Sequence, residues 1–308
     1  PLSFELFSSG IFIVAKAFYV SLEEARYALL VFPVGFAVSL LLSSYLADRV
    51  CLKSLVTISS SIYFLCSISC IALGNFTALI ISRLVQSFCV ASLVIVGRFI
   101  LVRYYDENKA AYSMAVIGGI VSIFTAAMPI IGGEIINAFS WKGIITLGAI
   151  FPLFIILTVI VLSATDFDFN QIVTPPFNYE KKAVYRKFYL SSKFLISGTI
   201  SVLFYSSAIS IVSLFSNIFL LFEKTPRQYY SYYLSMIIFF YASGQQFTGL
   251  LLKKCTSFNI IKHSALIIAL ISSSFLLFVY CMQIITPILP LVALCAFMLA
   301  TGMIVPLV

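Results

Sequence analysis

The stretch FTALIISRLVQSFCVASLVIVGRFILVR, residues 76–103, decides the architecture of this chain. It is apolar for longer than the ~20 residues that a helix needs to cross a bilayer, yet it holds Arg83 about two turns from its start. A cation at mid-bilayer costs ~2.5–3.5 kcal/mol or more, so such a residue usually has a partner or lies on a pathway. Gln86 follows one turn later on the same face, while Arg98 and Arg103 lie at the far end. We therefore expect a membrane-spanning helix with one polar face. The alternative is that Arg83 snorkels to the outer surface.

The composition is that of a membrane protein with many spans. Hydrophobic residues make up 62% of the 308 residues and charged residues only 10%, whereas a soluble domain is about half apolar and a quarter charged. The net charge of +8 is explained by basic cytoplasmic loops and does not require a nucleic-acid partner. The seven cysteines are odd in number and lack Cys-x-x-Cys spacing, and His263 is the single histidine. We expect reduced thiols and no metal site. The chain also lacks a nucleotide-binding loop and a nucleophile paired with a base, so we do not expect an enzyme.

The hydrophobic segments predict an all-α fold, because unpaired backbone is not tolerated in lipid. They predict a first six-helix bundle over residues 1–163, a cytoplasmic central loop over 164–193 and a partial second bundle over 194–308. Both ends of the chain lie inside apolar runs, so we expect truncation at both ends and about ten helices of a possible twelve. The expected helices cover residues 1–14, 25–47, 54–74, 76–97, 110–137, 142–163, 194–221, 229–252, 262–282 and 287–308.

Basic residues predict the orientation of the chain in the membrane. Lysines and arginines are far more numerous in one set of alternate loops than in the other, which places the richer set, the central loop and the N-terminus in the cytoplasm. Trp141 is then expected at the outer interface. The richer set holds Arg49, Lys53, Arg98, Arg103, Lys109, Lys181, Lys182, Arg186, Lys187, Lys193, Lys253, Lys254 and Lys262, and the other holds Lys16, Arg26, Lys142, Lys224 and Arg227.

Four stretches together carry a family resemblance. They are PLSFELF at residues 1–7, SYLADRVCLK at 44–53, Arg83-x-x-Gln86 with the later Arg98, and Met128-Pro129-Ile130-Ile131-Gly132-Gly133 followed by Ser140-Trp141-Lys142. They resemble, in the same order, motifs of the major facilitator superfamily, and most closely those of its bicyclomycin-resistance-type drug/proton antiporters. The resemblance extends along the whole chain and implies two helical bundles that rock around a central site.

The resemblance also implies roles for individual residues. Glu5 takes the place of a membrane carboxylate that binds a proton or a cationic substrate, and Arg83 with Gln86 forms a polar wall, with Glu5 as the expected partner of Arg83. Asp48, Arg49, Lys53 and Arg98 would latch the cytoplasmic side. Pro129, Gly132 and Gly133 would bend their helix and let a neighbour approach closely.

Plainer interpretations stay open for several of these residues. Asp48 and Arg49 can be a solvated turn, and Pro129 can mark an ordinary kinked helix. Outside the four stretches, Glu134 can face a cavity or lie solvated at the interface, and Gln245 and Gln246 can line a path or join helices by hydrogen bonds.

The function implied by the resemblance is secondary active transport by a multi-pass protein of the bacterial inner membrane. We expect proton-coupled efflux of drugs or small amphipathic molecules by alternating access, with the proton gradient as energy source and no cofactor. The expected partners are the small-molecule substrate, protons and the lipid bilayer, and we expect a monomer. The alternatives are proton-coupled uptake of a nutrient or metabolite, and a non-transporting or decayed membrane protein.

Overall fold

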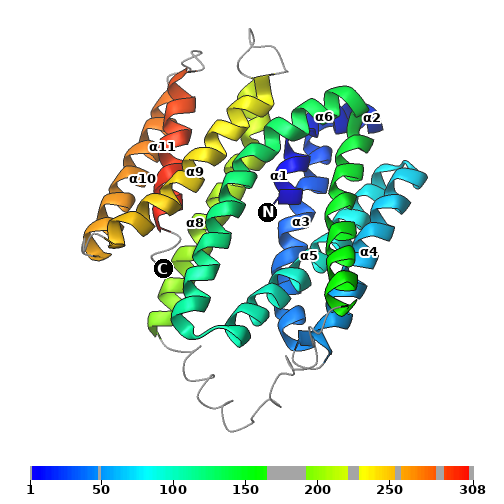
Figure 1. Ribbon diagram of the computed structural model, residues 1–308. Coiled ribbons are helices and arrows are strands. Elements are labelled where there is room, and N and C mark those ends of the chain that lie inside the picture. Colours follow the sequence, from blue (N-terminus) through cyan, green and yellow to red (C-terminus); the bar gives the residue numbers. More distant parts are fainter. Residues whose placement is uncertain are drawn as a thin grey trace. The chain divides into compact units, whose positions relative to one another are not determined.

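A computed structural model describes residues 2–47, 50–164, 192–220, 229–253, 258–281 and 288–304. Every regular element in these ranges is a helix, which confirms the predicted all-α class. The helices are α1 (Leu2–Ser8), α2 (Ile11–Phe18), α3 (Leu22–Ala47), α4 (Leu52–Leu73), α5 (Phe76–Tyr104), α6 (Glu107–Ala164), α8 (Ser192–Leu220), α9 (Tyr230–Lys253), α10 (Phe258–Cys281) and α11 (Ile288–Ile304) (Figure 1).

Local sequence signals explain where α3, α4 and α5 begin and end. At the start of α3, the backbone N–H and hydroxyl of Ser21 donate to the Glu24 carboxylate, and the Glu24 N–H donates back to the Ser21 hydroxyl, as in a capping box. Helix α4 stops at Gly74, whose φ of 60° is left-handed and suits glycine. Asn75 then caps α5, because its side-chain oxygen accepts from the Ala78 N–H at 2.7 Å.

The 58-residue element α6 consists of two helices that meet at a kink, which lies in the gap between the predicted helices 110–137 and 142–163. The backbone stays helical through Pro129, and the single non-helical residue is Ser140, with φ 62° and ψ −170°. This conformation is strained for a side chain other than glycine. The first predicted helix, 1–14, is instead two helices in the structure, because α1 ends at Ser8 and α2 begins at Ile11.

The described residues form two compact units, which we describe separately. The first comprises residues 3–118 and 134–164, and the second comprises 119–133 together with α8 to α11. The middle of α6, predicted within the first bundle, therefore groups with the later helices.

In the first unit, α5 packs against both α3 and α4. Small residues allow the helices to approach closely: a Cβ on Gly35 of α3 would overlap the Ser87 hydroxyl of α5. Further along the same pair, the hydroxyls of Ser43 and Ser92 are 2.8 Å apart. Such contacts between small and hydroxylated residues are typical of helix pairs in membranes. An apolar cluster from α4, α5 and the end of α6 completes this packing, with Leu52, Leu55, Val56, Ile95, Val96 and Val159.

In the second unit, α11 packs against both α9 and α10. The α9–α11 contact is close at the backbone, since a Cβ on Gly302 would overlap the Tyr241 carbonyl oxygen and one on Gly244 would overlap the Leu299 carbonyl oxygen. The Thr248 hydroxyl of α9 also donates to the Met303 carbonyl at 3.1 Å. These contacts fix the two helices side by side.

Three described helical stretches are long and apolar enough to cross a membrane: Leu52–Leu73, Phe76–Leu101 and Val116–Val161. Many large apolar side chains in the described helices are exposed, among them Ile123, Phe154 and Leu270. A soluble protein would bury such surface, and a bilayer solvates it. The chain is therefore a helical membrane protein.

Candidate functional site

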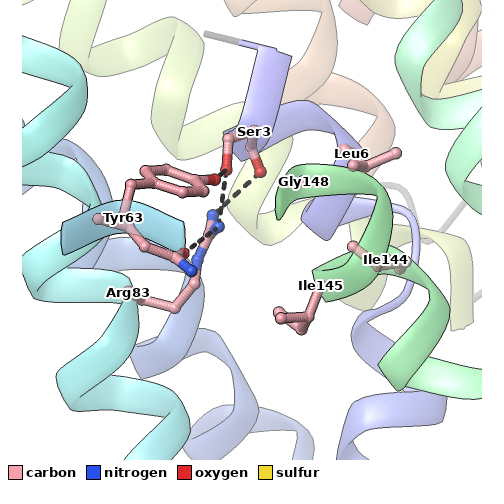
Figure 2. A pocket seen from close by; sticks show the side chains of 8 residues that line it. Ser3, Leu6, Tyr63, Arg83, Ile144, Ile145 and Gly148 are labelled. Carbon is pink, nitrogen blue, oxygen red and sulfur yellow. Dashed lines mark hydrogen bonds between the residues drawn. The ribbon is translucent and has the colours of Figure 1, made fainter. Parts of the chain in front are cut away.

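The Arg83 side chain is held inside the first unit. It is 2% exposed and bonds to neutral acceptors: Nη1 donates to the Ser3 hydroxyl at 2.9 Å and Nη2 to the Ser3 carbonyl at 3.1 Å. Nη1 also lies 3.4 Å from Gln86 Oε1, one turn along α5. Figure 2 shows the guanidinium reaching across to Ser3 on α1. The alternative in which Arg83 snorkels to the surface is therefore wrong.

Two aromatic rings flank the same guanidinium. Its central carbon lies 4.6 Å from the ring centre of Phe7 and 4.5 Å from that of Phe32. Both distances are within the range of cation–π attraction, which is strongest where water is excluded. Because arginine is planar and delocalised, the rings can stack on it in a way that a lysine ammonium would not reproduce.

The hydrogen bonds around Arg83 continue into α4 and close into a ring. The Ser3 hydroxyl lies 2.9 Å from the Tyr63 hydroxyl, and Gln86 Nε2 donates to the Ser67 hydroxyl at 3.0 Å. Ser67 in turn donates to the Tyr63 carbonyl at 2.9 Å. We call Ser3, Tyr63, Ser67, Arg83 and Gln86 the Arg83 network. It joins α1, α4 and α5 by polar contacts where apolar packing alone would leave an unsatisfied cation.

The predicted pairing of Arg83 with Glu5 is wrong. Among the described residues, no ion pair includes Arg83. The Ser3 hydroxyl, and not the Glu5 carboxylate, accepts the hydrogen bond from Arg83 Nη1. Glu5 follows Ser3 by two residues, a rotation of about 200° in a helix, so the two side chains leave α1 on opposite faces. Glu5 is nevertheless buried, at 9% exposure, and its Oε2 has no hydrogen-bond partner. The first unit thus holds a buried cation and a buried carboxyl group that do not contact each other.

A small cavity adjoins the Arg83 network. Its volume is about 10 Å³, and its polar wall consists of Ser3, Tyr63, Arg83 and Gln86. Residues of α6 form the opposite wall, among them Ile144 and Gly148, as Figure 2 shows. The cavity lies entirely within the first unit.

The predicted cytoplasmic latch is only partly described. Asp48 and Arg49 lie outside the described residues. Lys53 lies half-buried in the first turn of α4, and Arg98 is exposed near the end of α5. The latch therefore stays a prediction.

The predicted packing residues of α6 are buried. Pro129, Gly132 and Gly133 all lie inside the helix, and a Cβ on Gly133 would overlap the Ser231 side chain of α9. The close contact at Gly133 is therefore with Ser231, and both residues belong to the second unit. Nearby, the Ser235 hydroxyl donates to the Ala126 carbonyl, which adds a polar contact between the same two helices.

One of the weaker candidates takes the plainer role. Gln245 accepts from the Ser122 hydroxyl at 3.2 Å and donates to the Tyr241 hydroxyl at 3.2 Å, so it joins α9 to the middle of α6. Glu134 is exposed. Trp141, expected at the outer interface, is buried with its ring centre 4.7 Å from that of Phe18.

Sequence reasoning missed Ser3, Tyr63 and Ser67. Ser3 lies inside the motif at residues 1–7, but an uncharged hydroxyl is a weaker signal than the neighbouring carboxylate of Glu5. Nothing in the sequence distinguishes Tyr63 from the other sixteen tyrosines. Within the described ranges, no group of histidine, cysteine and acidic side chains could hold a metal ion, and Cys66, Cys70, Cys89 and Cys295 are free thiols.

The fold and the buried polar site define a class: a helical membrane protein with a buried ionisable centre in its first unit. The chain belongs to the Major Facilitator Superfamily, whose family model matches residues 2–308.

Relatives and solved structures agree with this class. The chain is 21% identical over 204 residues to a protein named multidrug resistance protein MdtL from Klebsiella pneumoniae, a match that covers 66% of this chain and 52% of that protein. It is 29% identical over 121 residues to the probable multidrug resistance protein EmrY of Escherichia coli, covering 39% of this chain and 24% of EmrY. The matches span about half or less of these curated relatives. The crystal structure of a D-xylose–proton symporter has the same fold, with a TM-score of 0.72, 11% identity, and coverage of 98% of this chain and 78% of that one.

Proposed function

We propose that this protein is a proton-coupled secondary transporter that exports small amphipathic molecules by alternating access. Membership of the superfamily supports secondary transport, and the names of MdtL and EmrY support drug-like substrates. In this plan two helical bundles rock about a central site so that it faces each side of the membrane in turn.

The observation that carries the proposal is Glu5, a carboxyl group buried in α1 whose Oε2 lacks a partner among the described residues. An ionisable group at such depth is costly to retain and by default indicates a functional site. Glu5 can bind a proton in one step of the cycle and exchange it for a cationic substrate group in another. Its separation from Arg83 supports this role, because a permanent ion pair would hold the carboxylate charged and occupied.

Arg83 and Gln86 have a different part in the proposal. The Arg83 network fixes α1 against α4 and α5, so that Glu5 is presented from a rigid element. A site supported in this way loses little free energy to ordering when it binds its proton or substrate. Arg83 is thus a positioning residue.

The proposal also places the N-terminus and the central loop 164–193 in the cytoplasm of a bacterial cell, on the distribution of basic residues. Asp48, Arg49, Lys53 and Arg98 would then stabilise closure on that side. Gly132 and Gly133 would keep α6 close to its neighbour while the bundles move. The proton gradient supplies the energy, and the transporting form is a monomer.

Transport by proteoliposomes tests the proposal. Purified protein is reconstituted, and accumulation of ethidium, a small amphipathic cation, is followed by fluorescence under pH gradients of both signs. A proton antiporter accumulates ethidium when the lumen is acidic, whereas a symporter accumulates it when the outside is acidic. A protein that does not transport ethidium accumulates none under either gradient.

Glu5→Gln isolates the proton role. We expect this variant to lose the gradient-driven accumulation of ethidium. Glu23→Gln is the matched control, because Glu23 is exposed at the start of α3 and the same chemical change there should leave transport intact. If Glu5→Gln transports as well as the parent protein, Glu5 does not carry the coupling proton.

A further inference from the structure

One nitrogen of the Arg83 guanidinium, Nε, is buried without a hydrogen-bond partner among the described residues. The guanidinium has five N–H donors, and its Nη atoms bond to Ser3 and Gln86. Its central carbon also lies over the rings of Phe7 and Phe32. Three of the five donors are used in these bonds, and of the three nitrogens only Nε is buried with no hydrogen-bond partner among the described residues. Buried donors of a charged group are almost always paired with protein or ordered water, so this donor needs an explanation.

A cavity beside Arg83 has space for an acceptor of this hydrogen bond. It has a volume of about 10 Å³ and is lined on one side by Ser3, Tyr63, Arg83 and Gln86 (Figure 2). A buried water needs a cavity of roughly 10–15 Å³, about one water-sized sphere, and two to four polar partners. This cavity meets both conditions, and it is too small for a transported molecule.

We propose that the cavity beside Arg83 is a hydration site that binds one water molecule. The water accepts from Arg83 Nε–H and bonds to the other polar groups of the wall, among which Tyr63 and Ser3 carry hydroxyls. It gives Nε–H a neutral acceptor, so that this donor needs no carboxylate. This inference stands independently of the proposed transport activity.

Gly148 offers a way to remove the water. It lines the cavity from α6, and a Cβ built there would lie 3.4 Å from the Tyr63 hydroxyl oxygen, at the edge of ordinary contact. Gly148→Ala therefore fills the cavity without forcing the backbone apart. Filling a dry void adds favourable contacts, whereas displacing a bound water leaves Nε–H unsatisfied. The sign of the stability change thus separates the two cases.

Gly97→Ala is the matched control. Gly97 lies inside α5 of the same unit, and a Cβ there would meet nothing within 4 Å. This variant measures what the Gly-to-Ala change alone contributes to a helix. We expect Gly148→Ala to melt at a lower temperature than Gly97→Ala in the same detergent. A higher melting temperature for Gly148→Ala would show that the cavity is dry and would overturn the proposal.

Radiolytic hydroxyl-radical labelling detects the water directly, because radicals formed from a bound water oxidise the side chains beside it. Tyr63 is 4% exposed and lies at the cavity, and Tyr230 is 2% exposed and packed against the Phe215 ring, so bulk solvent reaches both poorly. In the parent protein we expect Tyr63 to be labelled several-fold faster than Tyr230, as read by mass spectrometry. Equal labelling would overturn the proposal even if Gly148→Ala failed to fold. In a folded Gly148→Ala protein, the rate at Tyr63 should fall to that at Tyr230.

Discussion

Ser3 is the residue on which the Arg83 network most depends, and Ser3→Ala tests this. The change removes one of the two acceptors of Arg83 Nη1 and the partner of the Tyr63 hydroxyl, while the bond from Nη2 to the backbone carbonyl of residue 3 remains. A bond to a charged donor contributes ~1.5–3 kcal/mol, and a buried hydroxyl left alone costs a further ~1–3 kcal/mol. Hydrogen bonds between membrane helices contribute less free energy, ~0.6 kcal/mol on average and ~1.7 kcal/mol at most. We therefore expect Ser3→Ala to lower the free energy of unfolding by about 2 kcal/mol.

Tyr63→Phe completes a double-mutant cycle. Alone it removes one bond but leaves the Ser3 hydroxyl bonded to Arg83, so it should cost only ~1 kcal/mol. In the Ser3→Ala background it removes a hydroxyl that already lacks its partner, and so it should cost almost nothing. The two changes are then coupled by about 1 kcal/mol, with the double variant less destabilised than the sum of the single ones.

Equilibrium unfolding in detergent micelles with increasing SDS measures these differences, with circular dichroism reporting helix content. Ser9→Ala is the control, since Ser9 is a buried serine in the turn after α1 whose hydroxyl bonds only locally, to the Leu6 carbonyl. Its cost should not depend on Tyr63. Additivity of Ser3→Ala and Tyr63→Phe within ~0.3 kcal/mol would refute the shared network, because independent sites add to that precision.

Three further changes test other parts of the structure. Glu5→Gln should not lower the melting temperature in detergent, since no ion pair among the described residues includes Glu5, whereas breaking a buried ion pair would cost ~3–5 kcal/mol. Ser140→Gly should raise the free energy of unfolding by ~1 kcal/mol, measured as above, because φ 62° with ψ −170° suits glycine; no change would mean that the strain is absent. Gly302→Ala should lower it by ~1–3 kcal/mol because the new methyl overlaps the Tyr241 carbonyl, and a cost no greater than that of Gly97→Ala would contradict the close α9–α11 contact.

Most of the fold could be predicted because it depends on local chemistry. The apolar runs, the Gly74–Asn75 boundary and the charge distribution are properties of neighbouring residues, and they predicted helices that the structure contains. The separation of 110–137 from 142–163 was also predicted, since the kink at Ser140 lies in the gap between these two segments. The polar and small residues around Ser140 predicted a break there, and the backbone departs from helical geometry at that residue. One residue can take up the whole change of direction, and composition does not reveal this.

The candidate site was predictable only in part. Arg83 and Gln86 stand out because a polar residue inside a bilayer is costly, and the structure places both in one network. Glu5 stands out for the same reason, but charge alone suggested the wrong partner for Arg83. A sequence shows which residues carry opposite charges. Two such residues make contact only if both side chains point from their helices toward each other.

The sequence by itself determined that this chain is an all-helical membrane protein of the Major Facilitator Superfamily and that Arg83 must be accommodated by other groups. Only the tertiary structure decided which groups these are. Helix α1 presents Ser3, and not Glu5, to Arg83, because the two residues differ by about 200° in direction. Tyr63 and Ser67 reach the network because α4 packs against α5, a contact between residues that are far apart along the chain. Directions and distances of this kind follow from packing, which is why they could not be predicted from the order of the residues.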